Sequence, residues 1–398
     1  MAPVGTGRCD RLAQGCHQRS GFTQDTSHYC EASAALRPGQ GFFRPESRPS
    51  RDLGVLLARQ LGLAAPLRVL DLMTGCGIRA LRYGQESPAA LVWANDADPD
   101  RQPLLQANLA PLADRPGLEL RCTALTAQQL LAGCLQRQER FELVDLDAFG
   151  CPTALLPLAL EAVAFGGVLY VASTDGRSPT GHDRSAAVRT LGAAARAHPA
   201  SWELALRLQL GVIARTAWAM GRGLQPLFNF SEGRTFRTAA RILRRPLAGE
   251  ERQLGLLAHC HSCGEQQVQS LLRLRQWQVC CEPGAALAVS GPLWIGPLQD
   301  PATLAAILAA TAPEDPSLCR AAARLLSSLA ADAGLPARCW PMAELGRRLG
   351  GGPPPLQALL SDLQGQGWEA CASGVMPGQF RTDAPWALVL ERAGALNR

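Results

Sequence analysis

The chain has 398 residues, 47% of them hydrophobic, which is enough for two or three domains with substantial cores. No apolar run approaches the roughly 20 residues that a bilayer-spanning helix needs, which argues against a membrane protein. All 39 basic residues are Arg, and the formal net charge of +5 is compatible with binding nucleic acid without establishing it. The 14 Cys residues are scattered and follow no secretory signal, so we expect free thiols and a cytoplasmic protein.

Residues 1–40 are rich in Gly, Ser, Gln and Arg and show little hydrophobic periodicity, which predicts a disordered tail. Three acidic residues within this segment argue against a targeting sequence. Order is expected to begin at Gly41-Phe42-Phe43, ahead of an apolar helical stretch that ends at Leu63. Two adjacent aromatics before a nucleotide-binding fold are typical of a core edge or of a lid over a substrate, and both alternatives stay open.

From Leu67 onward, short apolar runs alternate regularly with longer helical patterns. This alternation predicts an α/β fold with a Rossmann-like, doubly wound parallel sheet. The strands are expected at residues 67–72, 91–95, 118–122, 141–146 and 167–173, with helices between them.

The first two predicted strands end in residues suited to a nucleotide cofactor. Asp71 precedes a loop with Gly75 and Gly77, whose backbone N–H groups can approach a ligand at a helix N-terminus. The second strand ends in Asn95-Asp96, at the distance where an acid can hold a ribose diol. The loop alone fits NAD as well as S-adenosylmethionine, but an Asp directly before it favours the cofactor with a cationic amino acid. Both carboxylates have an alternative role as helix caps.

The fourth predicted strand leads into two carboxylates, an aromatic and a Gly/Pro turn, in the sequence Asp145-Leu146-Asp147-Ala148-Phe149-Gly150-Cys151-Pro152. Open α/β sheets bind ligands at the carboxyl ends of their strands. An acid there can accept hydrogen bonds from an exocyclic amine, while an aromatic ring stacks on the base that carries the amine. The alternative is a strand end that is capped by an acid beside a buried Phe.

These motifs together resemble the tRNA (guanine-26-N2) dimethyltransferase family, a family of S-adenosylmethionine-dependent methyltransferases. The resemblance covers about residues 40–390 in order, and no single motif in it is decisive. Beyond the segments already quoted, it rests on Phe42-Phe43-Arg44-Pro45, Ser50-Arg51-Asp52, Ile78-Arg79, residues 172–175, 181–182, 210–217, 225–231, 291–298 and 380–385. It implies an enzyme that transfers one or two methyl groups to N2 of guanine 26 in tRNA.

The resemblance also implies roles for single residues. Asp147 matches the catalytic acid, and Phe149 and Phe42 match aromatics that clamp a flipped guanine. Positions that match contacts to S-adenosylmethionine, or that shape its pocket, are Arg51, Asp71, Gly75, Gly77, Arg79, Asp96, Thr123 and Ala124.

The chain departs from the family pattern in several places. Thr123 stands where the family has an Asp beside the adenine, so we expect weaker cofactor binding. Arg44 and Ser50 replace Asn, and Ala148 replaces a Pro, which loosens the loop that aims Phe149. A tRNA-binding protein that has lost catalysis would show such departures and stays open as an alternative. An amino-methyltransferase acting on another RNA or on a protein is a second alternative, and an NAD-dependent oxidoreductase is a third.

The sequence divides beyond the predicted tail into three units. We expect a methyltransferase domain over 41–245, a Cys-containing connector over 246–300 and a winged-helix-like domain over 301–398. In the last unit, helical patterns precede a short two-stranded ribbon, an α+β arrangement that fits contact with the tRNA backbone. No protein partner is indicated.

The connector contains Cys260-x-x-Cys263, which resembles one half of a zinc site. The family has a second Cys-x-x-Cys, but here the corresponding residues are the adjacent pair Cys280-Cys281, so the spacing is broken. The pair can supply one thiolate, with a histidine that flanks Cys260 as the fourth ligand. A lost metal site is the equal alternative.

Overall fold

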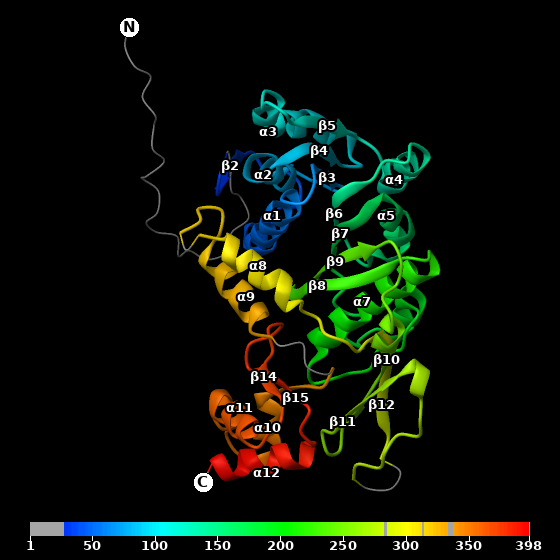
Figure 1. Cartoon of the computed structure of the whole chain (residues 1–398), viewed down its shortest axis with the longest axis vertical. Helices are drawn as coiled ribbons and strands as arrows, with labels where there is room; N and C mark the ends of the chain where they lie inside the picture. Colours follow the sequence, from blue (N-terminus) through cyan, green and yellow to red (C-terminus); the bar gives the residue numbers. More distant parts are fainter. Residues whose placement is uncertain (1–27, 282–284, 313, 333–336, 398) are drawn as a thin grey trace.

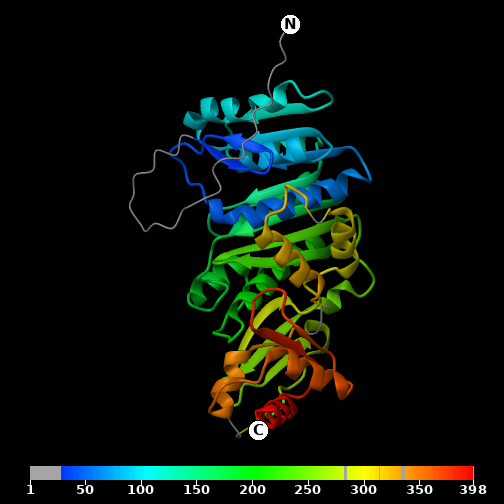
Figure 2. The same cartoon turned by 90° about the vertical axis from the view of Figure 1, so that its left-hand side faces the viewer.

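The computed structural model describes residues 28–281, 285–312, 314–332 and 337–397. The large sheet with its helices lies at one end of the long axis, and the small antiparallel sheet and the C-terminal unit lie side by side at the other end (Figures 1 and 2). No helix in the described ranges is long and apolar enough to cross a membrane.

Seven strands form the large sheet, in the order β5-β4-β3-β6-β7-β9-β8. The first five in sequence are parallel, and the predicted doubly wound sheet is confirmed. Their bounds are β3 (Leu67–Asp71), β4 (Ala89–Asn95), β5 (Glu119–Thr123), β6 (Phe141–Asp147) and β7 (Val163–Ser173). The later strands β8 (Gly223–Glu232) and β9 (Thr235–Leu243) form a hairpin in which β9 is antiparallel to both of its neighbours.

Helices cover both faces of this sheet, which explains why its central strands read as continuous apolar runs. One face is covered by α1 (Arg48–Gly62), α2 (Ile78–Glu86) and α3 (Gln102–Ala113). The other is covered by α4 (Ala127–Gln136), α5 (Leu156–Ala162) and α7 (Ser201–Ala219). The short α6 (Arg184–Ala186) lies in the connection between β7 and α7.

A hairpin of β1 (Tyr29–Glu31) and β2 (Ala34–Leu36) precedes the sheet. Glu31 is buried in it and pairs with Arg51 and Arg82, at 2.5 Å and 2.7 Å. A buried charge needs partners of opposite charge, and here Arg51 of α1 and Arg82 of α2 supply them. The composition of residues 1–40 does not reveal partners that lie outside this segment. The prediction of disorder is therefore wrong for residues 28–40, whereas residues 1–27 lie outside the described part of the chain.

The helices α8 (Pro301–Ala310) and α9 (Arg320–Ala330) pack on α1 and β8, beside the large sheet (Figures 1 and 2). Leu304, Ile307 and Leu326 belong to the same buried core as α1. Arg59 of α1 also pairs with Asp315 at 2.6 Å. The predicted domain boundary at residue 301 is therefore wrong, because the apolar faces of both helices are buried against the first domain.

The predicted connector contains the antiparallel sheet β11-β10-β12, which packs through β12 against α7. Its strands are β10 (Leu254–Cys260), β11 (Gln266–Ser270) and β12 (Leu287–Trp294).

The C-terminal unit has the winged-helix-like arrangement expected from the sequence. It comprises β13 (Cys339–Pro341), α10 (Met342–Leu349), α11 (Leu356–Gly365), β14 (Ala370–Ala372), β15 (Gln379–Thr382) and α12 (Trp386–Leu396). Helices precede β14 and β15 as expected, but β13 also pairs with β15, so the sheet has three strands instead of the predicted two. The rings of Trp340 and Trp386 stack at 4.9 Å in a separate core. The sequence pattern did not predict α12, which begins directly after Pro385.

Candidate active site

A cavity of about 350 Å³ opens at the carboxyl ends of β3, β4 and β6, where the strand order reverses. Connections leave an open α/β sheet in opposite directions at such a switch point, and ligands bind in the resulting crevice. Among the residues predicted from the sequence, those that line this cavity are Phe42, Arg51, Gly75, Arg79, Asp96, Asp147 and Phe149. The fold therefore brings predicted catalytic and cofactor-binding positions from distant segments into one site.

The loop after β3 is shaped by Asp71, which is fully buried and does not line the cavity. Its Oδ2 accepts hydrogen bonds from the Thr74 hydroxyl at 2.6 Å and from the Ala80 N–H at 3.1 Å. Burial and the neighbouring Asp145 raise the pKa of Asp71 to about 8. Asp71 thus holds the loop against the start of α2, and its predicted influence on the cofactor pocket is indirect.

The two glycines of this loop have different functions. Gly75 has a φ of +58° and open space where a side chain would begin, so its backbone faces the cavity without obstruction. Gly77 has a φ of +86°, and a Cβ there would lie 2.8 Å from Leu105. Gly77 therefore permits close packing of α2 and α3 rather than contact with a ligand.

Asp96 lies at the end of β4 and is partly exposed in the cavity. Its Oδ2 accepts the Gly75 N–H at 2.9 Å, and its Oδ1 accepts the Asp98 N–H at 3.1 Å. Each carboxylate oxygen can accept a further hydrogen bond. Asp96 is thus held in place by the backbone with acceptor capacity left for a ribose diol.

The structure does not bring Thr123 or Ala124 to this cavity. The Thr123 hydroxyl donates to Asn95 at 2.8 Å and accepts from the Trp93 indole at 2.9 Å. These contacts join β5 to β4 and leave the predicted adenine contact without support from the geometry.

Asp145 and Asp147 alternate along β6, and two arginines lie beside them. Asp145 is fully buried and accepts a hydrogen bond from the Tyr83 hydroxyl at 2.6 Å. Asp147 reaches the cavity, where its Oδ2 lies 2.6 Å from Arg237 Nη2 and 3.3 Å from Arg79 Nε. Arg79 also lies 3.4 Å from Asp145, so its positive charge is shared between the carboxylates of Asp145 and Asp147.

The electrostatic surroundings keep Asp147 ionised. Burial alone would raise the pKa of this carboxyl group, but Arg237 and Arg79 lower it to about 2. At neutral pH Asp147 is therefore a carboxylate that accepts hydrogen bonds.

Phe42 and Phe149 stand at the mouth of the cavity with 61% and 72% of their surfaces exposed. Their ring centroids lie 5.1 Å apart at an interplanar angle of 76°, so the rings meet edge to face. Large exposed aromatics in a cavity wall are typical of a binding site. One ring must turn before a flat base fits between them.

The loop that carries Phe149 is held by hydrogen bonds although Ala148 replaces the Pro of the family. Gly150 N–H donates to the Thr174 hydroxyl at 2.7 Å, and Gly150 C=O accepts from the Ser173 hydroxyl at 3.0 Å. These contacts tie the end of β6 to the end of β7, so the position of Phe149 does not depend on a proline.

Arg51 lines the cavity, but most of its hydrogen bonds point elsewhere. Its guanidinium pairs with Glu31 and donates to the carbonyl oxygens of Arg44 and Pro45, at 3.1 Å and 3.2 Å. Arg51 therefore connects the β1–β2 hairpin to the segment that presents Phe42.

Arg237 and Thr235 of β9 line the cavity and were not predicted from the sequence. Because β9 is antiparallel, its first residues meet the carboxyl ends of the parallel strands. The available signal was the presence of two arginines, Arg237 and Arg241, in the strand sequence of β9, because an Arg in a buried strand indicates a paired charge.

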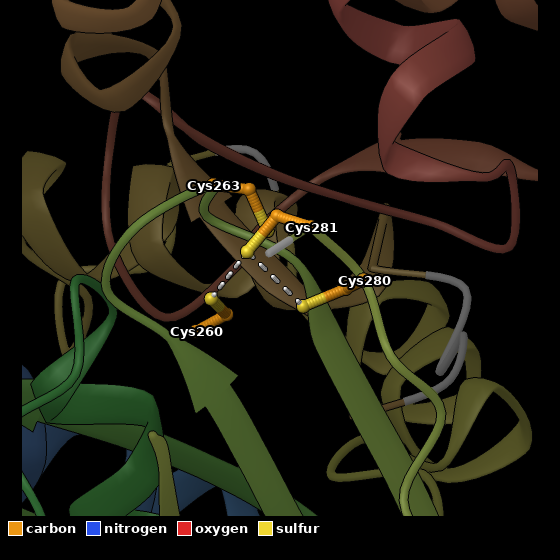
Figure 3. Close-up of side chains that lie close together, drawn as sticks. All are labelled: Cys260, Cys263, Cys280 and Cys281. Atoms are coloured by element: carbon orange, nitrogen blue, oxygen red, sulfur yellow. Dashed lines mark hydrogen bonds between the residues drawn. The ribbon is translucent and has the colours of Figure 1, made fainter. Parts of the chain in front are cut away.

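A second cluster shares no residue with this cavity; it lies at the end of β10 and contains Cys260, Cys263, Cys280 and Cys281 (Figure 3). The four sulfur atoms lie within 4.8 Å of one another, with Cys281 Sγ at 3.6 Å from Cys260 Sγ and 4.0 Å from Cys280 Sγ. Tetrahedral zinc with Zn–S bonds of about 2.3 Å places sulfur atoms about 3.8 Å apart, so donor chemistry and spacing fit zinc.

Both adjacent cysteines belong to this cluster, so a histidine is not needed to complete four ligands. The two histidines that flank Cys260 pack together instead, with the His259 and His261 rings 4.8 Å apart. Cys280 and Cys281 are adjacent in the sequence, unlike the Cys-x-x-Cys pair expected there. The chain ahead of β12 nevertheless brings both of them to the turn after β10.

The switch-point cavity, its glycine-rich loop and the doubly wound sheet define a nucleotide-cofactor-binding α/β enzyme. More particularly, the chain belongs to the N2,N2-dimethylguanosine tRNA methyltransferase family, whose model matches residues 27–393. The family predicted from the sequence motifs is thereby confirmed.

Relatives named tRNA (guanine(26)-N(2))-dimethyltransferase are similar along most of their length. The protein from Methanosphaerula palustris is 32% identical over 347 residues, which cover 86% of this chain and 89% of that relative. The protein from Pyrococcus furiosus is 29% identical over 366 residues, with 88% and 91% covered.

The solved structure of Trm1 from Pyrococcus horikoshii with S-adenosyl-L-methionine has the same fold, with a TM-score of 0.80 and 24% sequence identity. The similarity covers 92% of this chain and 99% of that one. It extends through the C-terminal unit, so the whole architecture, and not only the large sheet, is shared.

Proposed function

We propose that this protein transfers methyl groups from S-adenosylmethionine to N2 of guanine 26 in tRNA and forms the mono- and dimethylated base. The observation that carries the proposal is an ionised carboxylate, Asp147, beside two exposed aromatic rings in the switch-point cavity. Family membership and the names of the relatives support the substrate.

The residues present fit S-adenosylmethionine. Gly75 leaves its backbone open to the cavity, and Asp96 retains acceptor capacity for the ribose hydroxyls. The bound cofactor supplies an electrophilic methyl group on a sulfonium centre. The relative from Pyrococcus horikoshii was solved with this molecule, which supports the assignment.

Asp147 is proposed to orient the nucleophile. Guanine N2 is a weak nucleophile because its lone pair is delocalised into the ring, and a carboxylate that accepts its N–H fixes the amine towards the methyl group. With a pKa of about 2, Asp147 accepts this hydrogen bond without removing the proton beforehand. After transfer the methylated amine is cationic and acidic, and Asp147 is proposed to take up the proton that leaves.

Phe42 and Phe149 are proposed to receive the extruded base. A guanine stacked within tRNA must leave its neighbours to enter the cavity, and stacking on aromatic faces offsets part of this cost. Their exposure at the cavity mouth suits this function.

The C-terminal winged-helix-like unit is proposed to contact the backbone of the tRNA, in agreement with its arrangement of helices and ribbon. A cytoplasmic location is the expected one for such an enzyme and stays a prediction.

The four-cysteine cluster is proposed to hold one structural zinc ion. Its thiolates come from the turn after β10 and the loop before β12, so an ion would join two segments of the small sheet. The cluster contributes no group to the cavity at the large sheet, and we assign it no step in methyl transfer.

The test is incubation of the purified protein with an unmodified tRNA transcript and labelled S-adenosylmethionine, followed by mass spectrometry of the nucleosides. We expect N2-methylguanosine and N2,N2-dimethylguanosine, and loss of both when guanine 26 is replaced. Binding of tRNA without methyl transfer would favour a tRNA-binding protein that has lost catalysis. Methylation that persists without guanine 26 would favour a different RNA position.

A further inference from the structure

Arg237 presents a cation directly beside the carboxylate of Asp147. Its Nη2 donates to Asp147 Oδ2 at 2.6 Å, and its Nη1 lies 3.8 Å from Asp145 Oδ1. The guanidinium also lies over the Tyr170 ring, 5.4 Å from its centroid, and the residue is only 2% exposed. Contacts on several sides thus fix the guanidinium in the cavity wall.

Most of the donor capacity of Arg237 is unused. A guanidinium carries five N–H donors, yet Nε and Nη1 have no hydrogen-bond partner in the described part of the chain. These two nitrogen atoms are buried, so the donor that a ligand in the cavity could reach is on Nη2, which carries two N–H groups and uses one of them for Asp147 within the described residues.

Asp147 has unused capacity on its other oxygen. Both arginine contacts involve Oδ2, and no hydrogen bond to Oδ1 occurs within the described residues. The site therefore offers a free acceptor, Asp147 Oδ1, next to a charged donor group.

We propose that Arg237 determines the specificity for guanine by donating a hydrogen bond to O6 while Asp147 accepts from the N2 amine. The inference rests on the proposed function. Guanine carries an acceptor, O6, and two donors, N1–H and N2–H, along one edge, and arginine is the side chain most often used to bind O6. The ion pair of Arg237 and Asp147 presents the complementary order of donor and acceptor.

The same pair disfavours adenine-like bases. A 6-amino group points a donor at the guanidinium, and an unprotonated N1 points an acceptor at the carboxylate. Neither contact makes a hydrogen bond, so the remaining N–H of Arg237 and the Oδ1 atom of Asp147 lose their water without a replacement partner. Arg237 therefore distinguishes a 6-oxo group from a 6-amino group, whereas Asp147 interacts with the N1 and N2 positions of the base.

The experiment compares tRNA carrying guanine at position 26 with tRNA carrying 2,6-diaminopurine there. The two bases share the reacting N2 amine, so each is a methyl acceptor for the same chemistry. The measured quantity is the ratio of kcat/KM for the two substrates, in the unsubstituted protein and in Arg237→Gln, Arg237→Lys and Arg241→Gln. Because both substrates meet the same enzyme preparation, the ratio does not depend on how much of a variant is folded.

We expect the unsubstituted protein to prefer guanine about a hundredfold, and Arg237→Gln to reduce this preference to about tenfold or less. Arg237→Lys, which keeps a charged donor, should retain a larger part of it. Arg241→Gln is the matched control, since Arg241 lies on the same strand outside the cavity and should leave the preference unchanged.

An equal loss of kcat/KM for both substrates in Arg237→Gln, with the ratio unchanged, would overturn the inference and leave Arg237 as a partner of Asp147 only. Equal use of both bases by the unsubstituted protein would overturn it as well. Failure of the unsubstituted protein to methylate guanine 26 would instead refute the proposed function, so the two failures are distinguishable.

Discussion

The carboxylate of Asp147 is positioned by side chains from two other elements, Arg79 of α2 and Arg237 of β9. A carboxylate between two guanidinium groups is a weak base, so its contribution to methyl transfer is orientation of the amine and acceptance of a proton late in the reaction.

Asp147→Ala should reduce the rate of methyl transfer by about 10²–10⁴-fold, the range for a positioned acid or base, because the acceptor for N2–H is lost. Binding of tRNA should stay nearly intact, since the substitution removes no phosphate contact. Single-turnover rates and filter binding on the same preparations measure both. Loss of tRNA binding with unchanged activity per bound tRNA would contradict the role proposed for Asp147.

The low pKa of Asp147 predicts how stability and methyl transfer depend on pH in the unsubstituted protein. The pKa of Asp147 in the fold, about 2, is below its ordinary value, so its ion pairs stabilise the protein fully above about pH 4 and lose this contribution as the pH falls towards 2. Methyl transfer should therefore show no loss from protonation of Asp147 between pH 5 and pH 8.

In Arg79→Gln one of the two charges that lower the pKa of Asp147 is absent, and the acidic limb of the rate profile should move to higher pH. Profiles of kcat/KM between pH 4 and pH 8 measure this shift. A profile of Arg79→Gln that is as flat over this range as the profile of the unsubstituted protein would contradict this effect of Arg79 on the pKa of Asp147.

Among the elements, the loop before β12 determines whether the small sheet has a metal site. It brings two adjacent cysteines to the turn after β10, where four sulfur atoms converge (Figure 3). A structural zinc ion contributes free energy directly to folding, because the assembled site does not exist in the unfolded chain.

We expect about one equivalent of zinc per chain by elemental analysis, and a lower melting temperature after treatment with a strong chelator. Cys281→Ser should lower the zinc content, whereas Cys30→Ser should not, because Cys30 is an exposed cysteine of the β1–β2 hairpin. A protein purified with zinc in the medium that contains none, and whose melting temperature does not respond to the chelator, would indicate a lost site.

In the whole molecule, buried ion pairs connect the C-terminal unit to the rest of the chain. Arg381 of β15 is fully buried and lies 2.9 Å from Glu203 of α7, and it also pairs with Asp332. Glu203 has Arg207 as a second partner, at 2.8 Å. The orientation of the C-terminal unit relative to the large sheet thus depends on charges that are taken out of water.

Arg381→Met should destabilise the protein by about 3–5 kcal/mol, because it leaves carboxylates buried with fewer partners. Arg392→Met is the matched control: Arg392 pairs with Asp362 at the surface of the same unit, and little change is expected. Urea unfolding measures both free energies. A similar small effect of the two substitutions would show that the buried pair does not hold the unit in place.

Motifs with short spacing could be interpreted from the sequence because their function is local. The alternation of apolar runs predicted the five parallel strands. The Gly-rich loop, Asp96, Asp147 and Phe149 were identified because they follow predicted strands, and Phe42 because it precedes the first of them. Backbone conformation and strand ends are set by nearby residues, so local patterns carry this information.

Contacts between distant segments were decided by the tertiary structure. Glu31 orders a hairpin through Arg51 and Arg82, Arg237 reaches Asp147 across 90 residues, and α8 and α9 bury their apolar faces on α1. The physical reason is the same in each case: a buried charge or an apolar helix face is stable only when a partner covers it, and composition does not say which distant residue that partner is. The sequence by itself determined the family, the five parallel strands and several residues at the edge of the sheet. The tertiary structure alone added the β8–β9 hairpin and decided which charges surround these residues.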